Sequence, residues 1–141
     1  MTLQSREVRL IKLPEELPGE EHFELASTDV PEPRAGQVLL RSHLLSVDPF
    51  LRNFMNRQLA LGSSTRPSQG LLRTGRAVPG AAVSRVVVSR AAELSEGDWV
   101  MGRTGWREYA IAEPRGLRRL DPELAPVSTA LGVLGMPGFT A

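Results

Sequence analysis

The sequence predicts a mainly β fold, either a barrel or a sandwich with a few short helices, and three observations predict it. Short runs rich in β-branched and aliphatic residues recur along the chain, as at Arg6–Leu13 and Val83–Ser89. Many of the 11 prolines and 13 glycines fall between these runs, where they mark turns. No strand is followed by a G-x-G-x-x-G turn, so the 141 residues hold one domain and no dinucleotide-binding fold.

Three strands are predicted in the first third of the chain. Arg6–Leu13 ends at Pro14, and His22–Ser27 is expected to be the second strand. Gln37–Val47 carries apolar residues on both faces, which is typical of a central strand. His43 lies within it, and we expect a hydrogen-bonded core or rim residue rather than a metal ligand.

A short helix is predicted directly after this strand. Asp48 suits the N-cap and Pro49 the first helical position. A helix over Pro49–Arg57 has two apolar pairs at i, i+4 spacing, Phe50 with Phe54 and Leu51 with Met55. The next stretch, Gln58–Gly80, follows neither a strand nor a helix period, so we expect a long loop of the kind that forms lids and binding sites.

The stretch Gly97–Ala112 is predicted to form a hairpin and holds both tryptophans and the only tyrosine. Its strands are Trp99–Met101 and Trp106–Ala112, and the alternation of the second places Tyr109 and Ile111 on one face, which we expect to be the inner one.

The turn of this hairpin is bracketed by Gly102 and Gly105, where positive φ is accessible. It would place Thr104 beside Trp106, a polar group next to a flat apolar one, as one wall of a ligand pocket. The alternative is a core hairpin without a site. Beyond it we expect a strand at Leu117–Leu120 and a small apolar helix at Val127–Leu134.

The composition excludes several kinds of site. There is no cysteine, so disulfides, thiolate nucleophiles and cysteine-ligated zinc are excluded. Only His22 and His43 could supply imidazoles, and they lie far apart in the sequence, so we expect no bound metal. No apolar run approaches the ~20 residues that cross a bilayer, and the N-terminal stretch has no apolar signal region, so we expect a cytoplasmic protein.

The net charge of +1 is unevenly distributed. Residues 49–92 hold seven arginines and no acid, so this stretch could face phosphates or simply be solvated. Nucleic-acid binding would require bases interleaved with several aromatics, and only Phe50 and Phe54 lie nearby. We therefore expect no nucleic-acid partner.

Three segments, taken in order and spacing, are similar to those of one family. Ser46–Arg52, SVDPFLR, is similar to SVDPYMR. GDWV at Gly97–Val100 and GWREY at Gly105–Tyr109 are similar to GDLV and GWQEYA, and LGVLGMPGFTA at Leu131–Ala141 is similar to LGVLGMPGLTAY. On these segments the chain resembles the zinc-independent medium-chain dehydrogenase/reductases, with the NADPH-dependent alkenal and prostaglandin reductases as the nearest branch.

The resemblance implies a GroES-like, partly open β-barrel over residues 1–126. Residues 127–141 would begin the linker helices toward a nucleotide-binding domain that is absent from this chain. The implied activity of the full-length protein is hydride transfer from NADPH to the C=C bond of an enone or alkenal, with quinones as further substrates. The resemblance also implies a homodimer.

The resemblance also places residues around the cleft, and it assigns no catalytic acid or base to this chain. The residues that match the family on the cofactor side are Pro49, Phe50, Arg52, Met136 and Thr140. Those that match on the substrate side are Met55, Arg103, Thr104, Gly105 and Trp106. Phe50 stands where the family usually has tyrosine, and Ala81, Ala82 and Ser84 replace three family glycines.

Two other readings stay open beside the reductase. The chain ends where the family's linking helix would begin, so we expect a fragment of a longer reductase that alone neither binds NADPH usefully nor reduces an enone. The alternative is a free-standing GroES-like module that binds an apolar small molecule or a partner protein without a cofactor. A chaperonin-like ring subunit rests on barrel analogy alone.

Overall fold

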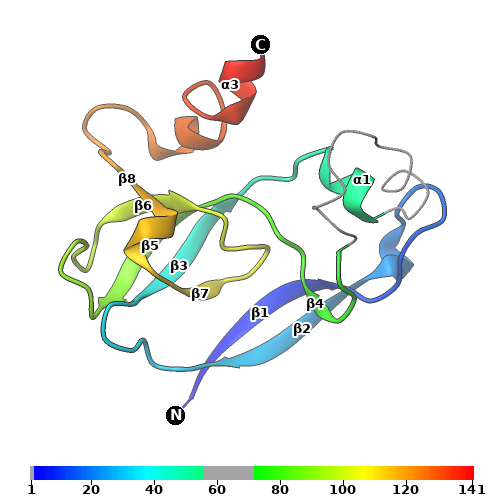
Figure 1. Cartoon of the computed structure of the whole chain (residues 1–141), viewed down its shortest axis with the longest axis horizontal. Coiled ribbons are helices and arrows are strands. Elements are labelled where there is room, and N and C mark those ends of the chain that lie inside the picture. Colours follow the sequence, from blue (N-terminus) through cyan, green and yellow to red (C-terminus); the bar gives the residue numbers. More distant parts are fainter. Residues whose placement is uncertain (1, 56–71) are drawn as a thin grey trace.

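The computed structural model describes residues 2–55 and 72–141, whose strands form two antiparallel sheets, with short helices between some of the strands and at the C-terminal end (Figure 1). The smaller sheet has the order β2-β1-β4, with β1 at Leu3–Leu10, β2 at Phe23–Val30 and β4 at Arg76–Ala77. The larger sheet has the order β7-β3-β5-β6-β8. Its strands are β3 Val38–Leu45, β5 Ala82–Ser89, β6 Trp99–Gly102, β7 Tyr109–Ala112 and β8 Leu117–Leu120. The prediction of a mainly β fold is confirmed.

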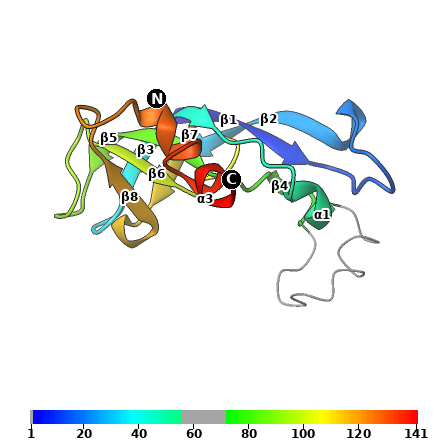
Figure 2. The same ribbon diagram turned by 90° about the horizontal axis from the view of Figure 1, so that it is seen from above.

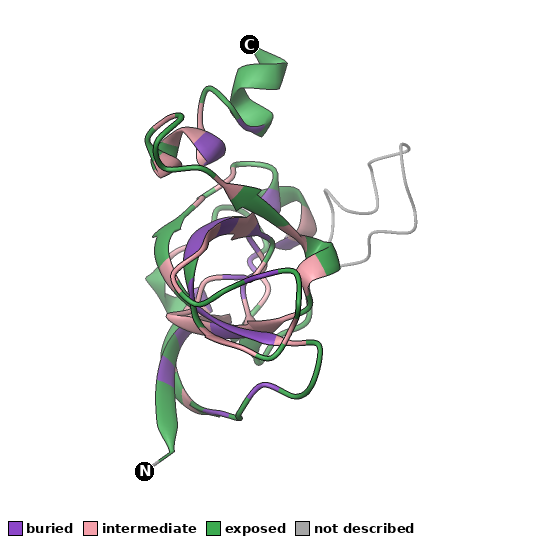
Figure 3. Ribbon diagram, turned by 90° about the vertical axis from the view of Figure 1, so that its left-hand side faces the viewer, coloured by how far each residue is buried: buried purple, intermediate pink, exposed green. Residues whose placement is uncertain are grey.

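The helices are short. They are η1 Glu20–His22, α1 Leu51–Met55, η2 Pro114–Gly116, η3 Val127–Leu131 and α3 Met136–Thr140. In Figures 1 and 2, α1 lies at the end of the molecule that also holds η1 and β4. Figure 1 shows α3 beyond the larger sheet, on the side of β8, and Figure 3 shows that this C-terminal segment is largely exposed.

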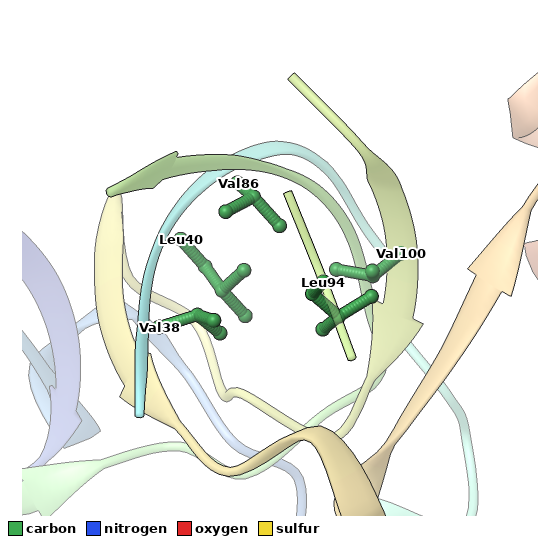
Figure 4. Close-up of a cluster of buried hydrophobic side chains, with 5 residues drawn as sticks. All are labelled: Val38, Leu40, Val86, Leu94 and Val100. Carbon is green, nitrogen blue, oxygen red and sulfur yellow. The ribbon is translucent and has the colours of Figure 1, made fainter. Parts of the chain in front are cut away.

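The larger sheet curls around the first core cluster (Figure 4). This cluster consists of Val38, Leu40, Val86, Leu94 and Val100, all at most 7% exposed. The curl does not close, because β7 and β8 are the two edge strands of the sheet. The strand β3 lies between β7 and β5, so its predicted central position is confirmed.

The predicted hairpin at Gly97–Ala112 is wrong. The strand β6 pairs with β5 and β8, whereas β7 pairs with β3 at the opposite edge of the sheet. Gly105 has the expected positive φ of 82°, but Gly102 lies within β6. A side chain at Gly102 would begin 2.5 Å from Leu117 Cδ2, so this glycine permits close approach of β8 rather than a turn.

The predicted inward position of Tyr109 and Ile111 is also wrong. Ala110 is the buried residue of β7, at 5% exposure, and its neighbours are half-buried. The reason is the register, because Ala110 pairs with Leu40 and therefore shares the inner face of the sheet with it.

Smaller differences concern the ends of elements. The strand β1 ends at Leu10 and β2 continues to Val30. The predicted loop Gln58–Gly80 contains the short strand β4, while its first part, to residue 71, lies outside the described residues. The predicted apolar helix Val127–Leu134 is a 3₁₀ helix that ends at Leu131.

Candidate functional site

The connection from β6 to β7, Arg103–Glu108, joins the two sheets, and we call it the crossing segment. On one side the Val8 N–H donates to the Trp106 carbonyl at 2.9 Å, and the Glu108 N–H donates to the Arg6 carbonyl at 3.0 Å. On the other side the Ser42 N–H donates to the Glu108 carbonyl at 2.7 Å. The crossing segment therefore holds β1 against β3 without belonging to either sheet.

Trp106 is the central side chain of this junction. Its ring stacks on that of Phe23, with 6.4 Å between centroids and 30° between planes. It packs against the second core cluster, which consists of Leu10, Leu51, Met55 and Val78. Its indole Nε1–H donates to the Ser46 carbonyl at 3.1 Å. Trp106 thus connects the crossing segment to the chain that leads into α1.

A hollow of about 350 Å³ opens beside Trp106. Its apolar lining includes Val8, Leu25 and Leu45 as well as the indole. His43 also lines it and is exposed, with its ring edge-on to Trp99 at 4.8 Å between centroids, so it lies at the rim of this hollow. This hollow is the place at the junction where an apolar group of a ligand could lie against Trp106.

Thr104 does not line the hollow beside Trp106. Together with Arg103 it lines a separate hollow of about 550 Å³, next to β7 and η2. Its Oγ1 is buried and has no hydrogen-bond partner among the described residues. The structure therefore does not bring Thr104 and Trp106 together as one wall, although they are only two residues apart.

The segment Ser46–Met55 carries four of the predicted site residues. Pro49 and Arg52 are exposed and Phe50 is 41% exposed, so these three are available to a ligand. Met55 is only 3% exposed and lies in the second core cluster. The helix α1 begins at Leu51, whose N–H donates to the Asp48 carbonyl at 3.1 Å.

The remaining two predicted site residues lie on α3. Met136 is 74% exposed, and the Thr140 hydroxyl donates to the Met136 carbonyl at 3.1 Å. The described hydrogen bonds of α3 stay within residues 132–141. The structure therefore presents Met136 and Thr140 on a separate, exposed helix.

Sequence reasoning missed two ion pairs at the junction. Arg6 and Glu108 form the first, with Nε at 2.9 Å from Oε1. Hydrogen bonding from Arg6 lowers the pKa of the Glu108 carboxyl, and the same contact raises the pKa of Arg6. The second involves Glu7, only 6% exposed, with its Oε1 at 2.7 Å from Arg9 Nε. The alternation of β1 places Glu7 on the same face as the buried Ser5 and could have indicated that this acid points inward. It does not reveal which base pairs with it.

Arg85 and Arg90, which belong to the acid-free stretch of residues 49–92, each contact another side chain. The Arg85 guanidinium lies 5.7 Å from the centroid of the Trp99 ring, and Arg90 pairs with Glu32 at 3.2 Å. Among the described residues no three or more His, Cys, Asp or Glu side chains form a group that could hold a metal ion. No helix in the described ranges is long and apolar enough to cross a membrane.

Residues 6–120 match the family model of the N-terminal domain of oxidoreductase. The chain belongs to this family. It is the GroES-like N-terminal domain of a medium-chain dehydrogenase/reductase, which confirms the family resemblance found in the sequence.

Relatives of this oxidoreductase domain include two curated proteins. The NADPH-dependent curcumin reductase of Escherichia coli is 41% identical over 132 residues, which are 94% of this chain and 36% of that protein. The 2-alkenal reductase (NADP(+)-dependent) of Nicotiana tabacum is 34% identical over 114 residues, which are 79% of this chain and 31% of that protein.

A solved structure is similar over nearly the whole domain. The crystal structure of CurA in complex with NADPH from Vibrio vulnificus has a TM-score of 0.82 and 36% sequence identity, and the match covers 96% of this chain and 38% of that one. The oxidoreductase domain therefore spans well under half the length of the relatives that it matches.

Proposed function

We propose that this domain forms the substrate-side wall of an NADPH-dependent reductase that acts on the C=C bond of α,β-unsaturated carbonyl compounds. The observation that carries the proposal is the likeness to the NADPH complex of CurA over 96% of the chain. The tobacco relative supports the substrate class, because a 2-alkenal carries its C=C bond next to the aldehyde. Bound NADPH would supply a hydride to the β-carbon of such a substrate.

The described residues fit one side of a nicotinamide nucleotide. Phe50 offers an exposed ring and Arg52 an exposed guanidinium at the start of α1, which suit a flat ring and a phosphate respectively. The chain has no glycine-rich strand-to-helix turn to hold a pyrophosphate. We therefore propose that Pro49, Phe50 and Arg52 line the cofactor side, with Met136 and Thr140 on α3, while other parts of the full-length protein bind most of the nucleotide.

On the substrate side we propose two contact regions. The hollow beside Trp106 offers an apolar surface, and Arg103 and Thr104 line the second hollow, next to β7 and η2. Met55 supports this region from beneath, because it is buried in the second core cluster. Gly105 allows the crossing segment to turn between the two regions, with a φ of 82°.

The activity can be tested on the natural full-length protein. NADPH oxidation is followed at the nicotinamide absorbance with a 2-alkenal, a cyclic enone and a quinone as separate substrates. Oxidation with any of them supports the proposal. Failure with all three, together with binding of apolar ligands in the absence of NADPH, would favour the cofactor-free binding module. Size-exclusion chromatography of the same sample tests the proposed homodimer.

A matched pair of variants tests the cofactor side. Arg52→Gln is expected to weaken NADPH binding by about ten- to a hundredfold, since a charge-assisted contact to phosphate contributes roughly 1.5–3 kcal/mol. Arg76→Gln removes another exposed arginine of the same acid-free stretch, on β4, and is expected to leave NADPH binding unchanged. Equal effects of the two variants would remove Arg52 from the site.

A further inference from the structure

We infer that Trp106 is a positioning residue whose indole N–H fixes the segment Ser46–Arg52. This inference rests on the proposed function for its consequence in binding NADPH, but its structural part is independent of any activity. The sequence suggested only that Trp106 forms a wall for the substrate. The structure adds that its indole N–H donates to the backbone carbonyl of Ser46, three residues before the predicted cofactor-side residues Pro49, Phe50 and Arg52.

The hydrogen bond between Trp106 and Ser46 is made in the short connection from β3 to α1. Ser46 directly follows the end of β3 at Leu45, and three residues further on begins the stretch Pro49–Arg52, in which only Leu51 is buried. The Ser46 N–H donates to the Ala81 carbonyl at 2.9 Å, and the Ser46 carbonyl accepts the indole N–H at 3.1 Å. Both backbone polar groups of Ser46 are therefore held, the N–H by Ala81 just before β5 and the carbonyl by Trp106.

Trp106 itself is held from several directions. Its backbone N–H donates to the Val78 carbonyl at 2.8 Å, and its carbonyl accepts from Val8 at 2.9 Å. Its ring stacks on Phe23 and packs on the second core cluster, to which Leu51 of α1 belongs. The indole thus contacts the segment Ser46–Met55 twice, through the Ser46 carbonyl and through Leu51 and Met55 of this cluster. A rigid donor of this kind defines where the segment lies.

Gly80 gives independent support. A Cβ at Gly80 would lie 2.7 Å from Trp106 Nε1 and 3.3 Å from the Ser46 carbonyl oxygen. Only glycine leaves room at this point for the indole edge and the carbonyl to meet. The absence of a side chain at Gly80 therefore leaves the space that the hydrogen bond between Trp106 and Ser46 needs.

The primary test uses amide hydrogen exchange and needs no activity. Trp106→Phe keeps an aromatic ring in the cluster and removes the donor. We expect exchange at the amides of Leu51, Arg52 and Asn53, which close the first turn of α1, to become about tenfold faster, the equivalent of ~1.4 kcal/mol. Trp99→Phe is the matched control on the outer face of the larger sheet and is expected to leave these amides unchanged. Unchanged exchange in Trp106→Phe would overturn the inference.

A second variant displaces the indole without removing it. Gly80→Ala is expected to accelerate the same amides as Trp106→Phe, because its methyl group occupies the place of the indole edge. Gly116→Ala is the control, since nothing lies within 4 Å of the added carbon and its φ is not positive. If Gly80→Ala behaves like Gly116→Ala, the close contact carries no positioning role.

Ligand binding separates this inference from the proposed function. In the natural full-length protein, Trp106→Phe is expected to raise the NADPH dissociation constant about three- to tenfold and to change the substrate KM less than that, consistent with the loss of one hydrogen bond. A rise confined to the substrate KM would make Trp106 a substrate wall only and would overturn the inference. If the unsubstituted protein binds no NADPH, the proposed function fails, and the exchange data alone decide the positioning role.

Discussion

The two core clusters of this domain are built in different ways. Three strands of the larger sheet contribute Val38, Leu40, Val86 and Val100 to the first cluster, so continuous backbone ladders hold those side chains in place. The second cluster gathers side chains from β1, from α1 and from Val78, which lies outside the strands, and Trp106 packs against it. Only Leu10 of this cluster lies in a strand ladder, whereas Leu51 and Met55 come from the five-residue helix α1.

This difference suggests a division of roles. The first cluster fixes the fold and lies inside the curl of the larger sheet (Figure 4). The second lies directly beneath the segment that presents Pro49, Phe50 and Arg52. Damage to the first cluster should therefore change stability alone, whereas damage to the second should change stability and ligand binding together.

The largest effect is expected at Leu40, which is fully buried in the first cluster. Leu40→Ala should lower the free energy of unfolding by about 2–5 kcal/mol, because it removes buried methyl groups and leaves a cavity. Chemical denaturation measures this loss, with Leu40→Met as the control of similar volume. NADPH affinity of the fraction that remains folded should be unchanged, and a large change in that affinity would contradict the division of roles.

A smaller loss of stability is expected at Met55 in the second cluster. Met55→Ala should cost about 2 kcal/mol, near the lower end of the range for a buried methionine, because α1 has only five residues and can settle into the space. Unlike Leu40→Ala, it should also weaken NADPH binding several-fold. Met55→Leu keeps the volume and should restore binding. A stability loss without any change in NADPH affinity would contradict the supporting role of the second cluster.

A still smaller, pH-dependent effect is expected at the ion pair of the junction. The pKa of Glu108 is lowered in the folded protein, so this carboxylate stabilises the fold at pH values above its ordinary pKa of 4.5. That contribution is lost as the pH falls through the lowered value. Glu108→Gln should therefore have a slightly lower Tm than the natural protein at neutral pH and the same Tm in strong acid. Because both side chains are largely exposed, added salt should also reduce the difference.

No effect is expected from removal of metal ions. A chelator should leave the Tm of this domain unchanged, since its 141 residues include no cysteine and only two histidines. Elemental analysis of the purified protein is the direct measurement. One tightly held zinc per chain would show that a cluster of ligands exists beyond the residues that the sequence suggested.

Local patterns predicted the elements well, and their partners poorly. The apolar residues on both faces of β3 predicted its central position. The i, i+4 spacing predicted two apolar pairs in α1, of which Leu51 and Met55 are buried, while Phe50 of the other pair is 41% exposed. The alternation of β7 could not show that Ala110 would pair with Leu40, because alternation does not say which face is covered.

The candidate site shows the same limit. The sequence singled out Trp106 by its rarity and by its place next to a glycine. Its contact with the Ser46 carbonyl joins residues 60 positions apart and involves a backbone atom, which leaves no trace in side-chain patterns. The carboxylate of the buried Glu7 likewise pairs with Arg9 and with Arg107. Arg107 lies on a distant part of the chain, so the pattern around Glu7 could not reveal it.

The crossing segment also affects the order in which the domain folds. The strand β1 is tied to it through Arg6 and Val8, and the Ser5 hydroxyl contacts the backbone of Tyr109, 104 positions later in the sequence. During synthesis on the ribosome, β1 can pair with β2 early but gains these contacts only after Tyr109 has emerged. Closure of so long a loop is entropically costly and slows folding. We therefore expect the nascent N-terminal strands to remain exposed to chaperones until most of the domain has been made.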